Sequence, residues 1–196
     1  MLHALQELLE PRILQTGPLV LQEDDEHSSC PPTRLEKSGQ TIALRFADWE
    51  YKPKIRIPTN RWLFPLFDIK RDDPPVARSC DYVIFHVPND PADENRLFVF
   101  LCELKSGKPK GAAAQLRNGM LLAEYALTVA QLHGRVHSWP QQTLFRGIVF
   151  AGSSPGLRGT TRVGDKADYV GDAICPDLRV ATLRPGSSYP LQYFCA

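Results

Sequence analysis

The feature that most constrains this chain is an apolar segment that ends in two opposite charges. The segment Arg96–Lys105, "RLFVFLCELK", has the apolar and aromatic composition of a buried strand, yet its last three residues include Glu103 and Lys105. Side chains alternate between the two faces of a strand, so Glu103 and Lys105 point to the same side. Burying either charge without a partner costs several kcal/mol. The end of this strand therefore needs a chemical reason to carry both, and we expect their ion pair to be exposed or half-exposed.

A second apolar segment, Asp81–Val87 or "DYVIFHV", indicates the partner strand. The nine residues from Pro88 to Arg96, "PNDPADENR", are polar and turn-forming, so the two segments predict an antiparallel hairpin. If the hairpin folds about residue 92, the middle of this connection, the numbers of facing residues sum to about 184. The Cβ atoms of directly opposed residues lie about 5 Å apart across a strand pair. This register places Asp81 opposite Glu103.

Two adjacent carboxylates with a nearby ammonium predict a metal site. The carboxylates repel each other unless a cation or a shared proton lies between them, and Mg²⁺ or Mn²⁺ prefers such oxygen ligands. Asp81 and Glu103 are the predicted ligands. Lys105 can polarise a water molecule or stabilise charge that develops on a phosphate. These are the groups needed to hydrolyse a phosphodiester bond.

The same residues carry a family resemblance. "CDYVIF", followed 22 residues after Asp81 by "ELK", resembles the D…E-x-K signature of the PD-(D/E)XK, or restriction-endonuclease-like, nuclease superfamily. The resemblance covers residues 79–131, with Cys80 in place of the proline, and implies an αβββαβ core and metal-dependent cleavage of nucleic acid. Gln115 and Tyr125 of "AQLRNGMLLAEY" resemble the Gln and Tyr that some branches carry on the following helix to support the site.

The order of the remaining patterns predicts an α/β protein with a central mixed sheet flanked by helices. We expect one domain over residues 1–196, with an acidic N-terminal helix and exposed connection in 1–35 and the core in 36–196. "LHALQELLE" predicts a short helix that buries Leu2, Leu5, Leu8 and Leu9. "TIALRFADW", "KIRIP", "FRGIVFAG" and "LRVATL" predict strands, and "GAAAQLRNGMLLAEYALTVAQLHG" predicts a long helix that buries Leu116, Met120, Ala123 and Leu127.

Further residues are candidates for the site. Glu36 in "RLEKSG" or Glu50 in "DWEYK" is a candidate to complete the metal shell, although acidic residues are more often solvated at the surface. Lys108, Lys110 and Arg117 follow the site and are candidates for binding phosphates of the nucleic acid. The alternative is that they belong to a solvated loop and helix face.

Two other patterns are weaker. His133 and His137 have the spacing of a metal pair on a helix, but Gly134 lies between them and the glutamate of H-E-x-x-H is missing. Residues 152–161, "GSSPGLRGTT", lack the Gly-Lys-Ser/Thr of a nucleotide-binding loop. They favour an ordinary connection, with a loop that contacts DNA as the alternative.

Composition leaves the location and the partner partly open. The net charge of +1 favours no class of partner by itself, and the five cysteines form no C-x-x-C pair, which is typical of reduced thiols in the cytosol. No apolar segment is long enough to cross a bilayer, so we expect a cytoplasmic protein without a membrane partner.

The predicted function is metal-dependent hydrolysis of nucleic acid, with DNA as the expected substrate and RNA as the nearest alternative. A homo-oligomer or a targeting protein partner is expected, because no recognition module is evident. Restriction, phage defence and repair are the settings that the resemblance implies. The alternatives are a non-catalytic binding or assembly module with the same fold, and an enzyme that hydrolyses another phosphate ester.

Overall fold

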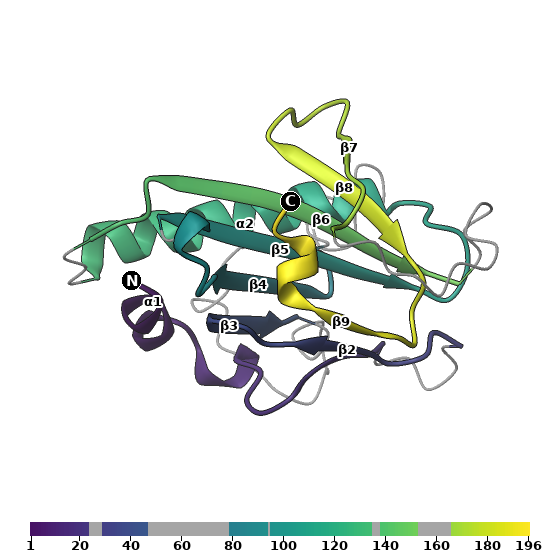
Figure 1. Cartoon of the computed structure of the whole chain (residues 1–196), viewed down its shortest axis with the longest axis horizontal. Coiled ribbons are helices and arrows are strands. Elements are labelled where there is room, and N and C mark those ends of the chain that lie inside the picture. The colour runs from purple at the N-terminus through teal and green to yellow at the C-terminus, as the bar shows by residue number, and fades with distance from the viewer. Residues whose placement is uncertain (24–28, 47–78, 94, 135–137, 153–165) are drawn as a thin grey trace, which may run out of the picture.

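The computed structural model describes residues 1–23, 29–46, 79–93, 95–134, 138–152 and 166–196, which form a mixed α/β fold with two sheets and two α-helices (Figure 1). The helices are α1 (Leu2–Leu8) and α2 (Ala112–His133), with short 3-10 turns η1 (Pro11–Ile13), η4 (Pro91–Asp93) and η5 (Leu191–Phe194). The strands are β1 (Leu19–Leu21), β2 (Thr33–Glu36), β3 (Gln40–Arg45), β4 (Tyr82–Val87), β5 (Arg96–Lys105), β6 (Gln142–Ala151), β7 (Val170–Gly171), β8 (Leu178–Leu183) and β9 (Ser188–Pro190).

The larger sheet has six strands in the order β3-β4-β5-β6-β8-β7. Strands β3, β4 and β5 are antiparallel, whereas β6 lies parallel to β5 and β8 lies parallel to β6. Strand β5 has the bounds that the sequence predicts, and residues 97–104 are all buried. A strand covered on both faces needs apolar residues in succession, which explains the uninterrupted composition of this segment.

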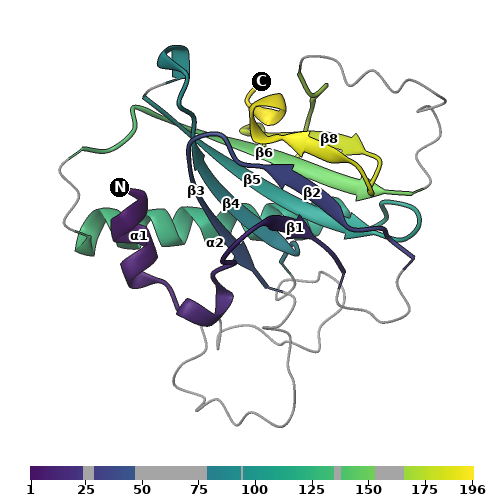
Figure 2. The same cartoon turned by 60° about the horizontal axis from the view of Figure 1, so that its bottom comes forward.

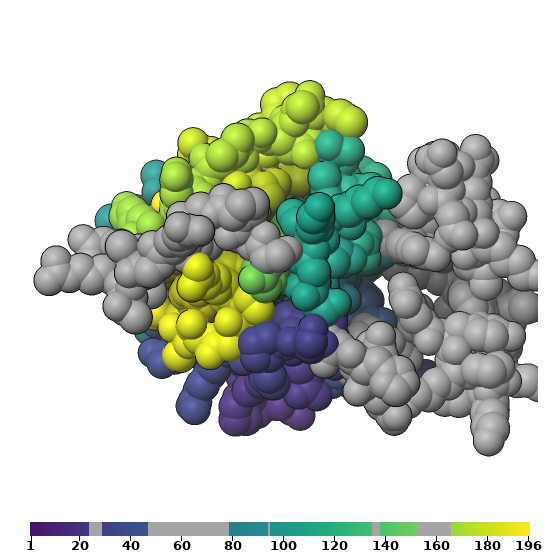
Figure 3. All heavy atoms as spheres, turned by 90° about the vertical axis from the view of Figure 1, so that its right-hand side faces the viewer, coloured from purple at the N-terminus to yellow at the C-terminus, as the bar shows by residue number. Residues whose placement is uncertain are grey.

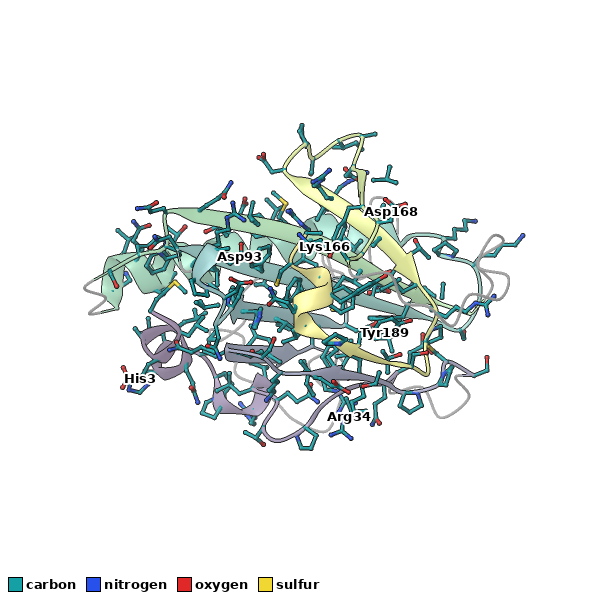
Figure 4. The ribbon with its side chains drawn as sticks, viewed as in Figure 1. His3, Arg34, Asp93, Lys166, Asp168 and Tyr189 are labelled. Carbon is teal, nitrogen blue, oxygen red and sulfur yellow. The ribbon has the colours of Figure 1, made fainter. Side chains whose placement is uncertain are left out.

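Different layers cover the two faces of this sheet (Figure 2). Helix α2 covers one face, where Leu116 packs in the same core as Val83 and Leu101. The small sheet β1-β2-β9 and the turn η5 cover the other face, where Tyr189 and Phe194 belong to the same core as β4 and β5 residues. Tyr189 is buried in this layer, while Arg34 on the neighbouring strand is exposed (Figure 4).

The long-helix prediction is confirmed. Leu116, Met120, Ala123 and Leu127 are all buried in α2, as their helical spacing predicts. The prediction of strands at "FRGIVFAG" and "LRVATL" is also confirmed, although β6 begins three residues earlier, at Gln142. None of the helices in the described ranges is long and apolar enough to cross a membrane.

The N-terminal prediction needs correction. Helix α1 buries Leu2 and Leu5, but Leu8 is 46% exposed. The predicted exposed connection contains strand β1, in which Leu19 and Leu21 are buried, and β2 begins before residue 36. A strand of three residues is too short to show a clear alternation, so only its packing against the larger sheet reveals it. The predicted strand "KIRIP" lies outside the described residues.

Candidate active site

The predicted hairpin register brings Asp81 to the end of β5. The β4–β5 pairs run from His86 with Phe98 to Tyr82 with Cys102, so the next step along the two chains sets Asp81 beside Glu103. The Asp81 Oδ2 accepts a hydrogen bond of 2.7 Å from the backbone N–H of Leu104. The predicted antiparallel register of β4 and β5 is confirmed, with Asp81 directly before β4, and a shared ion between Asp81 and Glu103 stays a prediction.

Glu103 is a buried acid with an ammonium as its partner. Its side chain is 1% exposed, and its Oε1 lies 2.6 Å from the Lys105 Nζ. Burial and the negative charge of Asp81 together raise the pKa of Glu103 from 4.5 to about 8, although Lys105 acts in the opposite direction. The expectation of an exposed or half-exposed pair is therefore wrong for Glu103, whose side chain lies on the same face of β5 as the buried Leu101.

The second oxygen of Glu103 is the observation that best fits a metal. The Oε2 is buried and has no hydrogen-bond partner among the residues that the structure describes. Buried oxygens are nearly always satisfied, so an unsatisfied carboxylate oxygen beside a second carboxylate suits a cation that prefers oxygen ligands. Asp81 and Glu103 are the two described residues that would hold Mg²⁺ or Mn²⁺ at this site.

Gln115 lies where the sequence predicts it, facing the site from the first turn of α2. Its Oε1 accepts a hydrogen bond of 2.9 Å from the Lys105 Nζ, and its Nε2 donates one of 3.3 Å to the Ser79 carbonyl. The two bonds use the amide as donor and acceptor, which fixes its orientation. Tyr125, by contrast, is 53% exposed and lies about 15 Å further along the helix, so its implied role at the site is wrong.

The three cations that follow the site differ in their surroundings. Lys108 and Lys110 are exposed in the loop between β5 and α2. Figure 3 shows the teal part of the chain at the surface, above the purple N-terminal segment and beside the yellow C-terminal segment. Arg117 donates two hydrogen bonds to the Asp172 carboxylate, 3.0 Å from Nε and 2.9 Å from Nη2. A role for these three residues in binding nucleic acid stays a prediction.

Glu36, one of the two acids proposed to complete the metal shell, has a different partner in the described structure. Glu36 is exposed on β2, where its Oε1 accepts a hydrogen bond of 2.7 Å from the Ser188 hydroxyl. Within the described ranges, no group of three or more His, Cys, Asp or Glu side chains is arranged to hold a metal. Glu50, His137 and residues 153–161 lie outside the described residues. Among the described residues, Asp81 and Glu103 are the carboxylates considered for the site.

Several neighbours of the site were not predicted. Cys30 lies close enough to the site for the Lys105 backbone and Asp81 to influence the pKa of its thiol. Burial is the largest influence, and the pKa of Cys30 is raised to about 11. Ser79 contributes only its carbonyl oxygen, which no sequence pattern reveals. Cys80 packs against Gly119 of α2, and a glycine in the middle of a helix was the available signal for a close approach.

Comparisons of the chain with protein-family models, with curated proteins and with solved structures found no match. The geometry around Glu103 and the D…E-x-K resemblance are therefore the two grounds for a functional proposal.

Proposed function

We propose that this chain is a divalent-metal-dependent nuclease that hydrolyses phosphodiester bonds in DNA. The observation that carries the proposal is the buried Glu103 carboxylate, which has Asp81 beside it, Lys105 on Oε1 and no hydrogen-bond partner for Oε2 among the described residues. Apart from β1 and β2, which belong to the small sheet, the order α1, β3, β4, β5, α2, β6 with β6 parallel to β5 supports the αβββαβ core that the resemblance implies.

The side chains divide the chemistry between them. A Mg²⁺ or Mn²⁺ ion held by Asp81 and Glu103 would supply Lewis-acid activation of water and neutralise phosphate charge. Lys105 keeps an ammonium at the edge of the same site, where it stabilises negative charge on a phosphate oxygen. Gln115 holds that ammonium through its Oε1 and is itself held by the Ser79 carbonyl.

Protonation of Glu103 sets the pH range of the proposed activity. A carboxylic acid must lose its proton before it binds a divalent cation. Because the pKa of Glu103 is raised to about 8, metal affinity and cleavage should both increase as the pH rises toward that value. Asp81 is half-buried, and its Oδ2 accepts a hydrogen bond from the Leu104 backbone N–H.

A metal titration combined with a cleavage assay tests the proposal. Mn²⁺ should raise the melting temperature of the chain in a concentration-dependent way. The free energy of unfolding should increase by about 2.7 kcal/mol when the ion is at 100 times its dissociation constant. The same protein should cleave plasmid or single-stranded DNA in Mg²⁺ and Mn²⁺. Asp81→Asn should remove both responses.

Asp172→Asn is the matched control, because it neutralises an acid of a second ion pair on α2 without touching Asp81 or Glu103. This variant should keep the response to Mn²⁺. If Mn²⁺ does not change the melting temperature of the parent, Glu103–Lys105 is a structural ion pair and the chain is a binding or assembly module. Cleavage of RNA but not DNA, or of a small phosphodiester but neither polymer, would redirect the substrate assignment.

The partners of the proposed nuclease stay predictions. Targeting by a homo-oligomer or by another protein, and a setting in restriction, phage defence or repair, follow from the resemblance alone.

A further inference from the structure

Gly119 lies in the middle of α2, where an alanine would form a better helix. Its backbone is not in the left-handed region that favours glycine, so conformation does not explain the residue. Contact does: a Cβ at this position would overlap the Cys80 Sγ and would lie 3.4 Å from the Ser79 Oγ. The missing side chain lets α2 lie directly against residues 79 and 80.

The segment that Gly119 touches leads straight into the site. Cys80 is 1% exposed, and its Sγ donates to the carbonyl oxygen of Tyr82 at 3.3 Å. Asp81 lies between these two residues in the chain. The position of Cys80 therefore fixes the backbone on which the Asp81 carboxylate stands.

The same turn of the helix also holds the ammonium of the site. Gln115 precedes Gly119 by about one helical turn, so both residues move with the same part of α2. Gln115 donates to the Ser79 carbonyl and accepts from Lys105, which in turn contacts Glu103. Any displacement of α2 from residues 79 and 80 would lengthen these hydrogen bonds and move the ammonium.

We infer that Gly119 is a positioning residue of the active site, and that it acts by closing the contact between α2 and Cys80. Through Cys80 it sets the place of Asp81, and through Gln115 it sets the place of Lys105. This inference rests on the proposed metal site, because it is the geometry of Asp81 and Glu103 toward the cation that the contact maintains. Groups that orient metal ligands typically change metal affinity by about 10- to 100-fold when they are altered.

A double-mutant cycle isolates the contact. Gly119→Ala introduces the overlapping Cβ, and Cys80→Ala removes the sulfur with which it collides. The Mn²⁺ dissociation constant is measured by electron paramagnetic resonance, at a temperature where circular dichroism shows every variant to be folded. Gly119→Ala should weaken Mn²⁺ binding by about tenfold in the parent. In the Cys80→Ala background, Gly119→Ala should weaken Mn²⁺ binding by less than about threefold, because the sulfur no longer occupies the space that the new Cβ needs.

Gly39→Ala is the control for a loss of stability alone. Gly39 has a φ of +112° and a Cβ there would collide with the Val87 carbonyl oxygen, at the opposite end of β4 from Asp81. This variant should melt at a lower temperature and keep the Mn²⁺ affinity of the parent. Its behaviour separates damage to the fold from displacement of the site.

The outcomes are distinct. Equal losses of affinity in both backgrounds, or a lower melting temperature with unchanged affinity for Gly119→Ala, overturn the positioning role and leave the proposed function standing. Absence of saturable Mn²⁺ binding by the parent refutes the metal site, and the inference with it. If Gly119→Ala alone does not fold, Cys80→Val enlarges the other side of the contact, and it should weaken Mn²⁺ binding in the folded protein; unchanged affinity overturns the inference.

Discussion

Two ion pairs lie beside the first half of α2, and the pKa values of their two carboxylates are shifted in opposite directions. In Lys105–Glu103 the charged atoms are 2.6 Å apart and the acid is 1% exposed, whereas in Arg117–Asp172 they are 2.9 Å apart and the acid is 6% exposed. The pKa of Glu103 is raised to about 8 by burial, while the hydrogen bonds from Arg117 lower the pKa of Asp172 to about 2. Similar distances therefore do not make the pairs equivalent.

The difference lies in the other partners of each carboxylate. Asp172 accepts two hydrogen bonds from Arg117 and two from the backbone N–H groups of Ile174 and Cys175. Glu103 has an oxygen without a partner among the described residues and a second acid beside it. A fully satisfied carboxylate stabilises the fold, whereas an incompletely satisfied one, held next to like charge, is suited to bind a cation.

The largest effect is expected from Lys105→Met. Loss of the ammonium should lower metal-dependent cleavage by about 100-fold or more, since a positioned charge of this kind acts on the transition state. The rate is measured per folded molecule, because the variant leaves the buried Glu103 without its counter-ion and should lose stability as Glu103 ionises. A variant that cleaves as fast as the parent would make Lys105–Glu103 a structural pair like Arg117–Asp172.

Arg117→Ala should act on stability. Removal of the guanidinium leaves the buried Asp172 with only its backbone donors, at a cost of about 2 kcal/mol in the free energy of unfolding. Urea unfolding at neutral pH measures this loss, and the Mn²⁺ affinity of the folded protein should not change. The double variant Arg117→Ala, Asp172→Asn should recover part of the stability, since it removes the unpaired charge. Parent-like stability of Arg117→Ala would contradict a structural role for the pair.

Glu103→Gln should reveal that the stability contributed by the Lys105–Glu103 pair depends on pH. The folded protein holds the Glu103 proton more tightly than the unfolded chain does, so the stability of the metal-free parent should fall as the pH rises from 4.5 toward about 8. The variant carries no such proton, so its stability relative to the parent should rise by up to about 5 kcal/mol across this pH range, at about 1.4 kcal/mol per pKa unit. Melting curves without metal test the trend. A pH-independent difference would mean that Glu103 is ionised throughout, as Asp172 is.

The smallest effect is expected in the loop after β5. Lys108 and Lys110 are exposed, so replacing both with alanine should leave the fold and the Mn²⁺ affinity unchanged. If each lysine contacts a phosphate, DNA affinity should fall a few fold. The slope of the logarithm of the binding constant against the logarithm of the salt concentration should become shallower by about 1 per lysine. Filter binding at several salt concentrations measures this slope. An unchanged slope would assign the two lysines to a solvated loop.

Local patterns in the sequence determined the strands of the site and their register. Continuous apolar composition defines β5, and the turn between the two segments fixes the pairing of β4 with β5, because a shift by one residue would turn every side chain to the other face. This register alone places Asp81 beside Glu103. Helical spacing similarly predicts the buried face of α2, and the resemblance to a known signature directed attention to Gln115.

Only the tertiary structure decided which charges are enclosed and which partners they have. Glu103 is buried on the face of β5 that carries Leu101, which packs in one core with α2 residues. Arg117 contacts Asp172 across 55 residues of chain. The contact of Gly119 with Cys80 likewise joins segments that no short window contains. Periodicity specifies a face of a strand or a helix but not what covers that face. Burial, and with it the pKa of Glu103, arises from packing between segments that are distant in sequence.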